Sequence, residues 1–339
     1  MKQNSASDFF EIVKNSPEVL TLQGVLTTGV SHYYEIAGRV LKDSGIELKR
    51  RDDEVFPIDR NFFSFLFLYS YYKAGIDISH CEMYVTVNQA LRGIVTGCDN
   101  ILDDEYKCTI DTDLPENAKR FRSIIDLLVS DRVLFELFMQ ANKEGKLSSE
   151  QVSEAISLSL KALIPSGVQE ASEEGHDVTW LSPDEILSQV HHYKTGLLFI
   201  SPWKIPLLLE PHLTKASEPV QEALYAIGMG CQVFDDVMDI ALDFNQGNHN
   251  YVASSIYQQC GEEGIRELES MIQDQGEVTP EVLFECFPDL KEAVCGKAME
   301  YLENGLALLF GEEKAALKEL SLSFLIRRIG VDGVVRPFQ

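Results

Sequence analysis

The chain has 339 residues, and its 54 Asp and Glu against 29 Lys and Arg give a formal net charge of −25 at pH 7. So large an acidic excess argues against nucleic acid or an anionic membrane surface as a partner. The length suffices for a sizeable hydrophobic core, and no Pro-, Gly- or Ser-rich linker divides the chain, so we expect a single domain over residues 1–339.

The N-terminal segment lacks the apolar core of a signal peptide, and no run of about 18 apolar residues predicts an integral membrane segment. The seven cysteines are odd in number and show no CxxC spacing, which argues against a disulfide framework and against a zinc site. We therefore expect free thiols and a cytoplasmic location.

Helix signals recur along the chain, whereas convincing strand alternation does not. One helix is predicted to begin near Ser79 or His80 and to end at the acidic sequence GCDNILDDE, and the polar run Thr109–Asn117 is predicted to be the loop that follows. The sequence Ser148-Ser149-Glu150-Gln151 has the pattern of a capping box and predicts the start of another amphipathic helix.

Further helix signals follow in the second half of the chain. Ser182-Pro183-Asp184-Glu185 predicts an N-cap, a proline in the first turn and a capping glutamate, at the start of a helix through HHYKTGLLF. Ser217 is predicted to cap a long helix from about Glu218 to Phe244, which ends at Asn245–Asn248. Roughly ten or more helices with short loops predict an all-α protein, a single large helical bundle.

Two clusters of aspartates lie inside apolar helical stretches, where a carboxylate is costly to bury unless a cation neutralises it. The clusters consist of Asp99, Asp103 and Asp104, and of Asp235, Asp236 and Asp239. In each cluster the outer carboxylates are four residues apart and therefore share one helix face. If two such faces meet in a bundle, they form an acidic cage suited to Mg²⁺, which prefers carboxylate, water and phosphate oxygens.

These motifs resemble those of the trans-isoprenyl diphosphate synthase (polyprenyl synthetase) family of the class I isoprenoid synthase superfamily. Asp99–Asp103 (DNILD) resembles the first DDxxD motif of the family, and Asp235–Asp239 (DDVMD) matches the second. Between them, Lys194-Thr195 resembles the family's lysine-threonine element, and Ser130–Leu134 resembles its Gly-Asp-x-x-Leu segment. Gln232 stands where the family often has Gln. The resemblance implies the class I fold, with the active site in the central cavity of the bundle.

The resemblance also implies a site and a mechanism. Its catalytic residues would be Asp99, Asp103, Lys194, Asp235, Asp236 and Asp239, and its metal ligands would be Asp99, Asp103, Asp235 and Asp239. These ligands would hold up to three Mg²⁺ ions, with Mn²⁺ as an alternative, and Thr195 and Gln232 would help to bind the substrate. The metals and Lys194 would stabilise pyrophosphate as it leaves an allylic prenyl diphosphate, with an allylic carbocation remaining in an apolar pocket.

The match is incomplete at the second basic site, with which condensing members of the family bind isopentenyl diphosphate. Arg60 is retained, but Pro57 replaces a lysine, no Arg-Arg-Gly follows the first cluster, and no Gly-Lys follows the second. Arg92 stands where the family has His or Gln, seven residues before Asp99, and could restore charge to a site shared with Arg60. A pairing of Arg92 with a nearby carboxylate, solely to stabilise the bundle, is the alternative interpretation.

Three functions remain open on this basis. The leading hypothesis is a trans-prenyltransferase that joins the allylic diphosphate to isopentenyl diphosphate or another acceptor, with Arg60 and Arg92 binding the second substrate. The second is a terpene synthase that acts on a single prenyl diphosphate, favoured by the thinned basic site and by the extended acidic run Asp103–Glu105. The third is a non-catalytic partner subunit of an active homologue, against which the complete second motif and Lys194 argue.

Two further expectations come from the resemblance. Residues just before the first cluster form the floor of the product pocket in the family, and here they are Ile94 and Val95, without a Phe or Tyr. We therefore expect a substrate or product of C15 or longer. Relatives are commonly dimers, so we also expect a homodimer.

Overall fold

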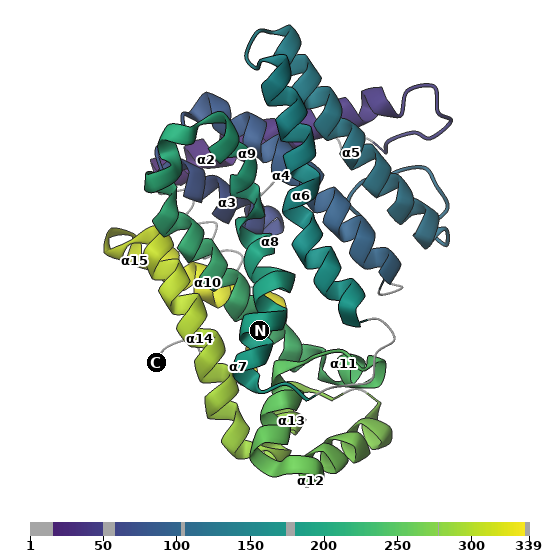
Figure 1. Ribbon diagram of the computed structural model, residues 1–339, viewed down its shortest axis with the longest axis vertical. Coiled ribbons are helices and arrows are strands. Elements are labelled where there is room, and N and C mark those ends of the chain that lie inside the picture. The colour runs from purple at the N-terminus through teal and green to yellow at the C-terminus, as the bar shows by residue number, and fades with distance from the viewer. Residues whose placement is uncertain (1–15, 50–57, 103–105, 174–179, 277, 336–339) are drawn as a thin grey trace. The chain divides into compact units, whose positions relative to one another are not determined.

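The computed structural model describes residues 16–49, 58–102, 106–173, 180–276 and 278–335. Within these ranges the chain is helical, with no β-strand and one isolated antiparallel bridge, between Leu48 and Thr112 (Figure 1). The predicted all-α class is confirmed. Over the same ranges, no helix combines the length and the apolar character that crossing a membrane requires.

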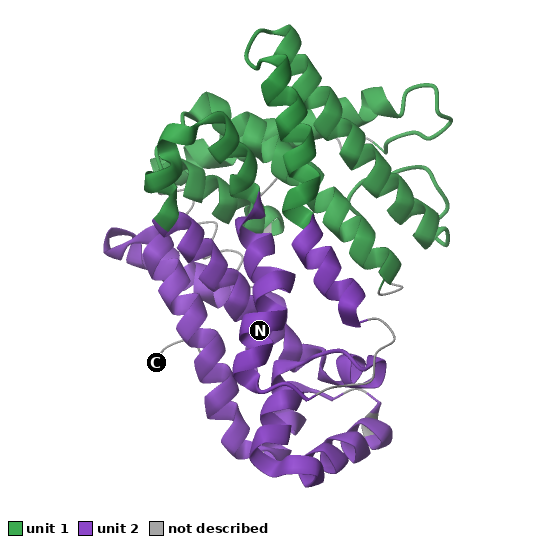
Figure 2. Ribbon diagram, viewed as in Figure 1, with its two compact units in different colours: residues 1–163, 202–218 green, residues 164–201, 219–339 purple. Residues whose placement is uncertain are grey.

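The chain divides into two compact units, which are described separately here. Unit 1 comprises residues 1–163 and 202–218, and unit 2 comprises residues 164–201 and 219–339 (Figure 2). The first aspartate cluster belongs to unit 1, whereas Lys194 and the second cluster belong to unit 2. The expectation of a single domain over residues 1–339 stays a prediction.

Unit 1 is organised around the helix that carries the first aspartate cluster. Its elements are α2 (Pro17–Val40), the 3₁₀ turn η1 (Ile58–Asn61), α3 (Phe62–Lys73), α4 (Ile78–Leu102), α5 (Lys119–Lys143), the first part of α6 (Ser149–Glu173), α9 (Lys204–Leu209), η4 (Pro211–Leu213) and the start of α10 (Thr214–Met238). The central helix α4 packs against α2, α3 and α5. A buried hydrogen bond of 2.8 Å between the hydroxyls of Tyr33 and Ser130 joins α2 to α5.

Unit 2 contains the lysine-threonine element and the second cluster. After the end of α6, its elements are α7 (Pro183–Glu185), the π-helix η2 (Ile186–Gly196), α8 (Leu197–Ile200), most of α10, α11 (Ile240–Gln246), α12 (Tyr251–Gln275), α13 (Pro280–Cys286), α14 (Pro288–Phe310), η5 (Glu312–Lys314) and α15 (Ala315–Ile329). The 3₁₀ turn η3 (Ser201–Trp203) spans the boundary with unit 1. The core of unit 2 is formed by fully buried side chains such as Val233, Phe234, Leu302 and Phe310.

Several predicted helix starts are confirmed. Helix α4 begins at Ile78, within two residues of the prediction. At the start of α6, Gln151 N–H donates to Ser148 Oγ over 3.1 Å, and Ser148 N–H donates to Gln151 Oε1 over 2.9 Å. The Ser182–Glu185 capping box forms as predicted. In each case the side chains satisfy N–H groups that a helix start leaves without partners.

The prediction of one helix from Glu218 to Phe244 is wrong in two respects. Helix α10 begins earlier, at Thr214, and Ser217 lies inside it, where the hydroxyl donates back to Thr214 O over 2.8 Å instead of capping the helix. The helix is also interrupted at Asp239 (φ −97°, ψ 10°), so that α11 follows as a separate element. The predicted end is confirmed, because Gly247 terminates α11 in a left-handed conformation.

Candidate functional site

The first aspartate cluster lies at the C-terminal end of α4. Asp99 and Arg92 are exposed there, whereas Ile94 and Val95 are half-buried. Arg60 is exposed in η1, also in unit 1. Asp103 lies outside the described residues, as do Asp104 and Glu105. Asp99 is therefore the one carboxylate of this cluster that the described part of the chain places, on the surface of unit 1.

Asn100, which replaces the second aspartate of the motif, faces inward and is 2% exposed. Its Nδ2 donates to the carbonyl oxygen of Lys107 over 3.1 Å, and its Oδ1 accepts from the N–H of Lys107 over 2.8 Å. A carboxylate can only accept, so it could not satisfy both groups. Asn100 thus holds the segment that returns from the cluster, and it does so with both atoms of its amide.

A buried polar network continues from this segment into α5. Arg122 is 6% exposed, and it donates from Nε to the hydroxyl of Tyr106 over 2.9 Å and from Nη1 to the carbonyl oxygen of Leu114 over 3.1 Å. Its Nη2 lies 3.6 Å from Asp111 Oδ1. These partners occupy the guanidinium group, so this cation orders the loop before α5.

The neighbours Asp235 and Asp236 of the second cluster have opposite environments. Asp235 is exposed on α10, and Asp239 is half-buried where α10 gives way to α11. Asp236 is 2% exposed. Because successive residues of a helix point in different directions, one sequence motif supplies both a surface carboxylate and a buried one.

The carboxylate of Asp236 is surrounded by donors. Its Oδ1 accepts from Gln232 Nε2 over 3.0 Å, and its Oδ2 accepts from the N–H of Tyr251 over 2.6 Å and lies 2.9 Å from His191 Nε2. Burial alone would raise the pKa of this carboxyl, but His191, the Tyr251 N–H and Gln232 together hold it below its usual value. Asp236 is therefore an ionised internal anchor that joins η2, α10 and α12.

Lys194 projects from η2 toward acidic side chains of the same unit. Its Nζ lies 3.1 Å from Glu170 Oε1, and its backbone carbonyl accepts from Ser166 Oγ over 2.9 Å. Burial disfavours the charged ammonium, but Glu170, Asp243 and Glu173 outweigh that cost and hold the pKa of Lys194 above its usual value. The lysine is thus a fixed positive charge in a negative surrounding. The next residue, Thr195, donates its hydroxyl proton to Gln232 Oε1.

Asp243 of α11 and Asn250, the residue before α12, extend the site. Asn250 caps α12, and its Nδ2 donates both to the backbone oxygen of Asp236 and to Asp243 Oδ2, each over 2.8 Å. Burial, and next the charge of Asp236, raise the pKa of Asp243 to about 7. The N–H of His249 donates to Glu173 Oε2 over 3.0 Å. The loop between α11 and α12 is therefore hydrogen-bonded to Glu173 and to Asp243, two of the carboxylates whose charges act on Lys194.

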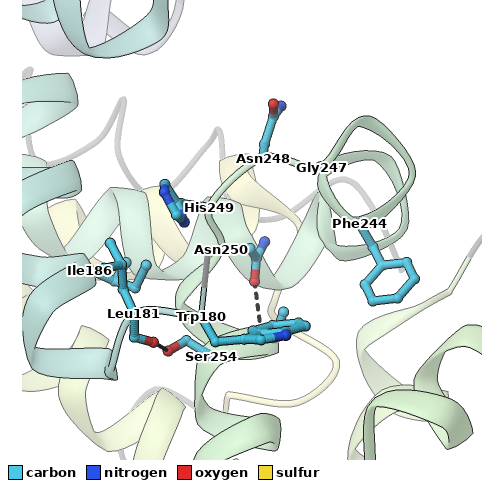
Figure 3. Close-up of a pocket in the computed structure, with 10 residues that line it drawn as sticks. Trp180, Leu181, Ile186, Phe244, Gly247, Asn248, His249, Asn250 and Ser254 are labelled. Atoms are coloured by element: carbon cyan, nitrogen blue, oxygen red, sulfur yellow. Dashed lines mark hydrogen bonds between the residues drawn. The ribbon is translucent and has the colours of Figure 1, made fainter. Parts of the chain in front are cut away.

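An apolar cavity of about 110 Å³ lies beside this loop (Figure 3). Trp180, Ile186 and Phe244 line it together with residues 247–250. Trp180 also stacks on Tyr257, with ring centroids 4.8 Å apart and planes 13° apart. Asn250 lines the cavity and also donates to the backbone oxygen of Asp236, so this residue connects the cavity with the second motif.

The structure brings together four of the residues predicted for the site, namely Lys194, Thr195, Gln232 and Asp236. It adds several that the sequence reasoning did not single out for the site: Glu170, Glu173, His191, Asp243 and Asn250. No group of three or more His, Cys, Asp or Glu side chains converges as a metal site among the described residues. The metal cage built from both clusters stays a prediction.

Comparison with known proteins places the fold. No protein-family model and no curated protein matches the sequence. Solved structures do match over nearly the whole chain. A geranylgeranyl pyrophosphate synthetase from Pyrococcus horikoshii is 15% identical, with a TM-score of 0.58, over 96% of this chain and 98% of its own. A geranylgeranyl pyrophosphate synthase from Lactobacillus brevis is 14% identical, with a TM-score of 0.59, over 93% of this chain and 98% of its own.

A third match carries ligands. A polyprenyl synthase from Caulobacter crescentus, solved with calcium and isoprenyl diphosphate, is 15% identical, with a TM-score of 0.57, over 91% of this chain and 97% of its own. At such identities the likeness concerns the fold. The chain has the all-α fold of the isoprenyl diphosphate synthases, which confirms the fold expected from the motifs.

Proposed function

We propose that this protein, whose fold is that of the isoprenyl diphosphate synthases, is a Mg²⁺-dependent class I isoprenoid synthase that ionises an allylic prenyl diphosphate. The observation that carries the proposal is the arrangement of side chains in unit 2. Neighbouring carboxylates keep Lys194 positively charged there. In the same unit, buried hydrogen bonds order the second motif around Asp236. The complex of the Caulobacter relative with isoprenyl diphosphate supports the same class of substrate.

The donor set fits a hard divalent cation. Asp99 and Asp235 are exposed, and Asp239 is half-buried at a helix break, so a cation can approach their carboxylate oxygens. Together with Asp103 they would hold Mg²⁺, which, when bound, stabilises negative charge on the leaving pyrophosphate. Lys194, which is positively charged, would donate hydrogen bonds from its ammonium group to phosphate oxygens. Asp236 would act through the side chains that it positions, since protein donors already surround it.

The leading form of the proposal is a trans-prenyltransferase that uses isopentenyl diphosphate or another acceptor. Arg60 and Arg92 would bind the second diphosphate, and both are exposed in unit 1. The half-buried Ile94 and Val95 would leave room for a chain of C15 or longer. A non-catalytic partner subunit is disfavoured, because the second motif is complete, with Asp235 exposed, and Lys194 is retained.

One observation favours the alternative, a terpene synthase that acts on one prenyl diphosphate. The resemblance implies cations after the first motif in condensing enzymes. Here that segment is Tyr106 to Asn117, and the buried Arg122 that follows it is directed inward, at Tyr106 and Leu114. A second diphosphate would therefore rely on fewer cations than it does in condensing relatives.

The purified full chain, incubated with Mg²⁺ and C10, C15 or C20 diphosphates with and without isopentenyl diphosphate, distinguishes these forms. Elongation that requires both substrates supports the transferase, and hydrocarbon or alcohol from one diphosphate supports the synthase. Products are identified by gas chromatography and mass spectrometry, and pyrophosphate release is measured in parallel. If no prenyl diphosphate releases pyrophosphate at any Mg²⁺ concentration, the proposed function is wrong.

We also propose a homodimer, with α5 in the interface. Four large apolar side chains of α5 are at least 39% exposed, and they are Phe121, Ile124, Leu128 and Phe135. The first three are spaced three and four residues apart and therefore share one face. A row of large apolar side chains on one helix face is typical of a surface that another protein covers.

A further inference from the structure

The segment formed by η2 and α8 runs alongside α10, and three pairs of residues connect it with α10 in one antiparallel register. His191 pairs with Asp236, Thr195 pairs with Gln232, and Phe199 of α8 lies against Gly228. Each step is four residues forward in one segment and four residues back in the other. At Gly228 a Cβ atom would come within 2.7 Å of the Phe199 ring, so the absence of a side chain permits the third pair.

The π conformation of η2 matches this pairing. Its buried residues are Ile186, Val190, His191, Thr195 and Gly196, which recur every four to five positions. An α-helix would instead bring residue 193 toward the buried face, whereas Tyr193 is 43% exposed. π-Helical turns are rare and are found frequently at functional sites, and they persist where other contacts hold them. Two such contacts are the pairs that His191 and Thr195 make with α10.

His191 is the most constrained member of these pairs. It is 1% exposed, and because a carboxylate can only accept, its Nε2 must carry the proton donated to Asp236. Its Nδ1 has no partner among the described residues. The bond to Asp236 is thus the one hydrogen bond of this buried ring among the described residues, and Lys194 is three residues further along the same π-helix.

We propose that His191 is a positioning residue: its bond to Asp236 keeps η2 in the π register that directs Lys194 toward the diphosphate site. This inference rests on the proposed function. Loss of the bond would free η2 to shift toward i→i+4 hydrogen bonding, which rotates every residue beyond the shift. Lys194 would then leave the acidic surroundings that hold its ammonium opposite the second motif.

Four variants test the role of the bond. His191→Leu removes the donor, and His191→Gln restores an N–H near the position of Nε2. His191→Asn carries the same amide on a shorter side chain that does not reach Asp236. His192→Leu is the matched control, since His192 is the next residue of η2 and contacts Tyr225 OH, over 3.0 Å, instead of Asp236. Circular dichroism and thermal unfolding establish which variants fold.

Two readouts follow, calorimetric binding of inorganic pyrophosphate with Mg²⁺ and hydrogen exchange of residues 186–196 in the free protein. For His191→Leu we expect binding weaker by about tenfold or more and faster exchange by a similar factor, as befits one hydrogen bond to a charged group. His191→Gln and His192→Leu should stay within about threefold of wild type, on the same reasoning.

Specific results would overturn the inference. One is a folded His191→Leu variant that binds pyrophosphate as wild type does, and another is a folded His191→Gln variant as impaired as His191→Leu. If His191→Leu does not fold, the comparison is made between His191→Gln and His191→Asn. Equal pyrophosphate binding by these two variants would overturn the inference. If wild type itself neither binds pyrophosphate nor releases it from a prenyl diphosphate, the proposed function fails. Hydrogen exchange still decides in that case whether His191 holds η2.

Discussion

At the residue scale, adjacent positions of one motif perform different tasks. The sequence identified Asp235, Asp236 and Lys194 by residue type and spacing, and in the structure all three lie in unit 2. It could not predict that Asp236 is buried under three donors, because those donors come from η2, α10 and α12. Their convergence depends on tertiary packing and leaves no local sequence pattern.

The contrast between Asp235 and Asp236 gives the first prediction. Asp236→Asn should lower the free energy of unfolding by roughly 2–4 kcal/mol, because it places an amide among donors that an ionised carboxylate satisfied. Asp235→Asn, at an exposed position, should leave stability within about 0.5 kcal/mol and reduce turnover about a hundredfold or more. Urea unfolding and steady-state kinetics measure the two effects, and equal stability losses in the two variants would contradict this assignment.

Asn100 gives a second prediction, which opposes what the motif alone suggests. Asn100→Asp restores the DDxxD sequence, but it replaces a donor to the Lys107 carbonyl with a second acceptor. We expect it to lower the free energy of unfolding by about 1–3 kcal/mol and not to raise activity. Thermal unfolding of the purified variant and a turnover assay test this. A variant as stable as wild type and more active would show that Asn100 is a defective ligand.

Asp126 of α5 provides a pH-dependent prediction. Burial raises its pKa to about 6, although hydrogen bonds from Thr109 and Ile110 and the charge of Arg122 oppose the shift. The folded state therefore holds the proton more tightly than the unfolded state, and the stability from this group is lost as the pH rises through about 6. Asp126→Asn keeps an acceptor but does not ionise.

From pH 5 to pH 7.5, wild type should lose roughly 1 kcal/mol of unfolding free energy relative to Asp126→Asn. Urea unfolding at both pH values measures this difference, and Asp131→Asn, at an exposed position of the same helix, is the control. A difference between Asp126→Asn and wild type that does not change with pH would contradict the prediction.

At the element scale, local signals located three of the four helix starts that they predicted. Ser148 and Ser182 cap as predicted, because a capping box is complete within four residues. Ser217 does not cap, and the interruption of the helix at Asp239 has no local signal, since DDVMDIALDF reads as continuous helix. The π-helix η2 was likewise outside the reach of the sequence, because side chains of α10 contribute to its stability.

Two glycines of α14 allow a test of how closely this helix packs against α10. At Gly305 a Cβ would lie 2.7 Å from the backbone oxygen of Ala223 on α10, whereas at Gly296 a Cβ meets nothing within 4 Å. Gly305→Ala should therefore destabilise the protein by about 1–3 kcal/mol through overpacking. Gly296→Ala should stabilise it by about 0.5–1 kcal/mol, because alanine has the higher helix propensity. Thermal unfolding of both variants decides, and equal effects would mean that α10 and α14 pack less closely than described.

At the scale of the whole molecule, composition and helix periodicity predicted the all-α class, and the paired motifs predicted the fold that the solved relatives share. The cage that unites both aspartate clusters is a different matter. It depends on how residues of unit 1 and unit 2 are placed together, which no spacing within one helix determines. It therefore stays a prediction, as do the metal count and the nature of the acceptor.

The proposed homodimer belongs to this scale. Leu128 on α5 is 54% exposed, and Leu128→Glu would place a charge in the proposed interface. We expect wild type to elute as a dimer and Leu128→Glu as a monomer at the same concentration, as measured by size exclusion with light scattering. Leu20→Glu on α2, at a position that is 47% exposed, is the control and should remain dimeric. A monomeric wild type would rule out the dimer.

The shared register of η2, α8 and α10 also limits how the chain can diverge. One inserted or deleted residue between 191 and 199, or between 228 and 236, would misalign at least one of the three pairs. Gaps in an alignment of distant homologues should therefore fall outside these two segments. The spacing His-x₃-Thr-x₃-Phe, combined with Gly-x₃-Gln-x₃-Asp further along the chain, is consequently a pattern with which to search for relatives. It could identify those whose overall sequence identity is too low for detection by alignment.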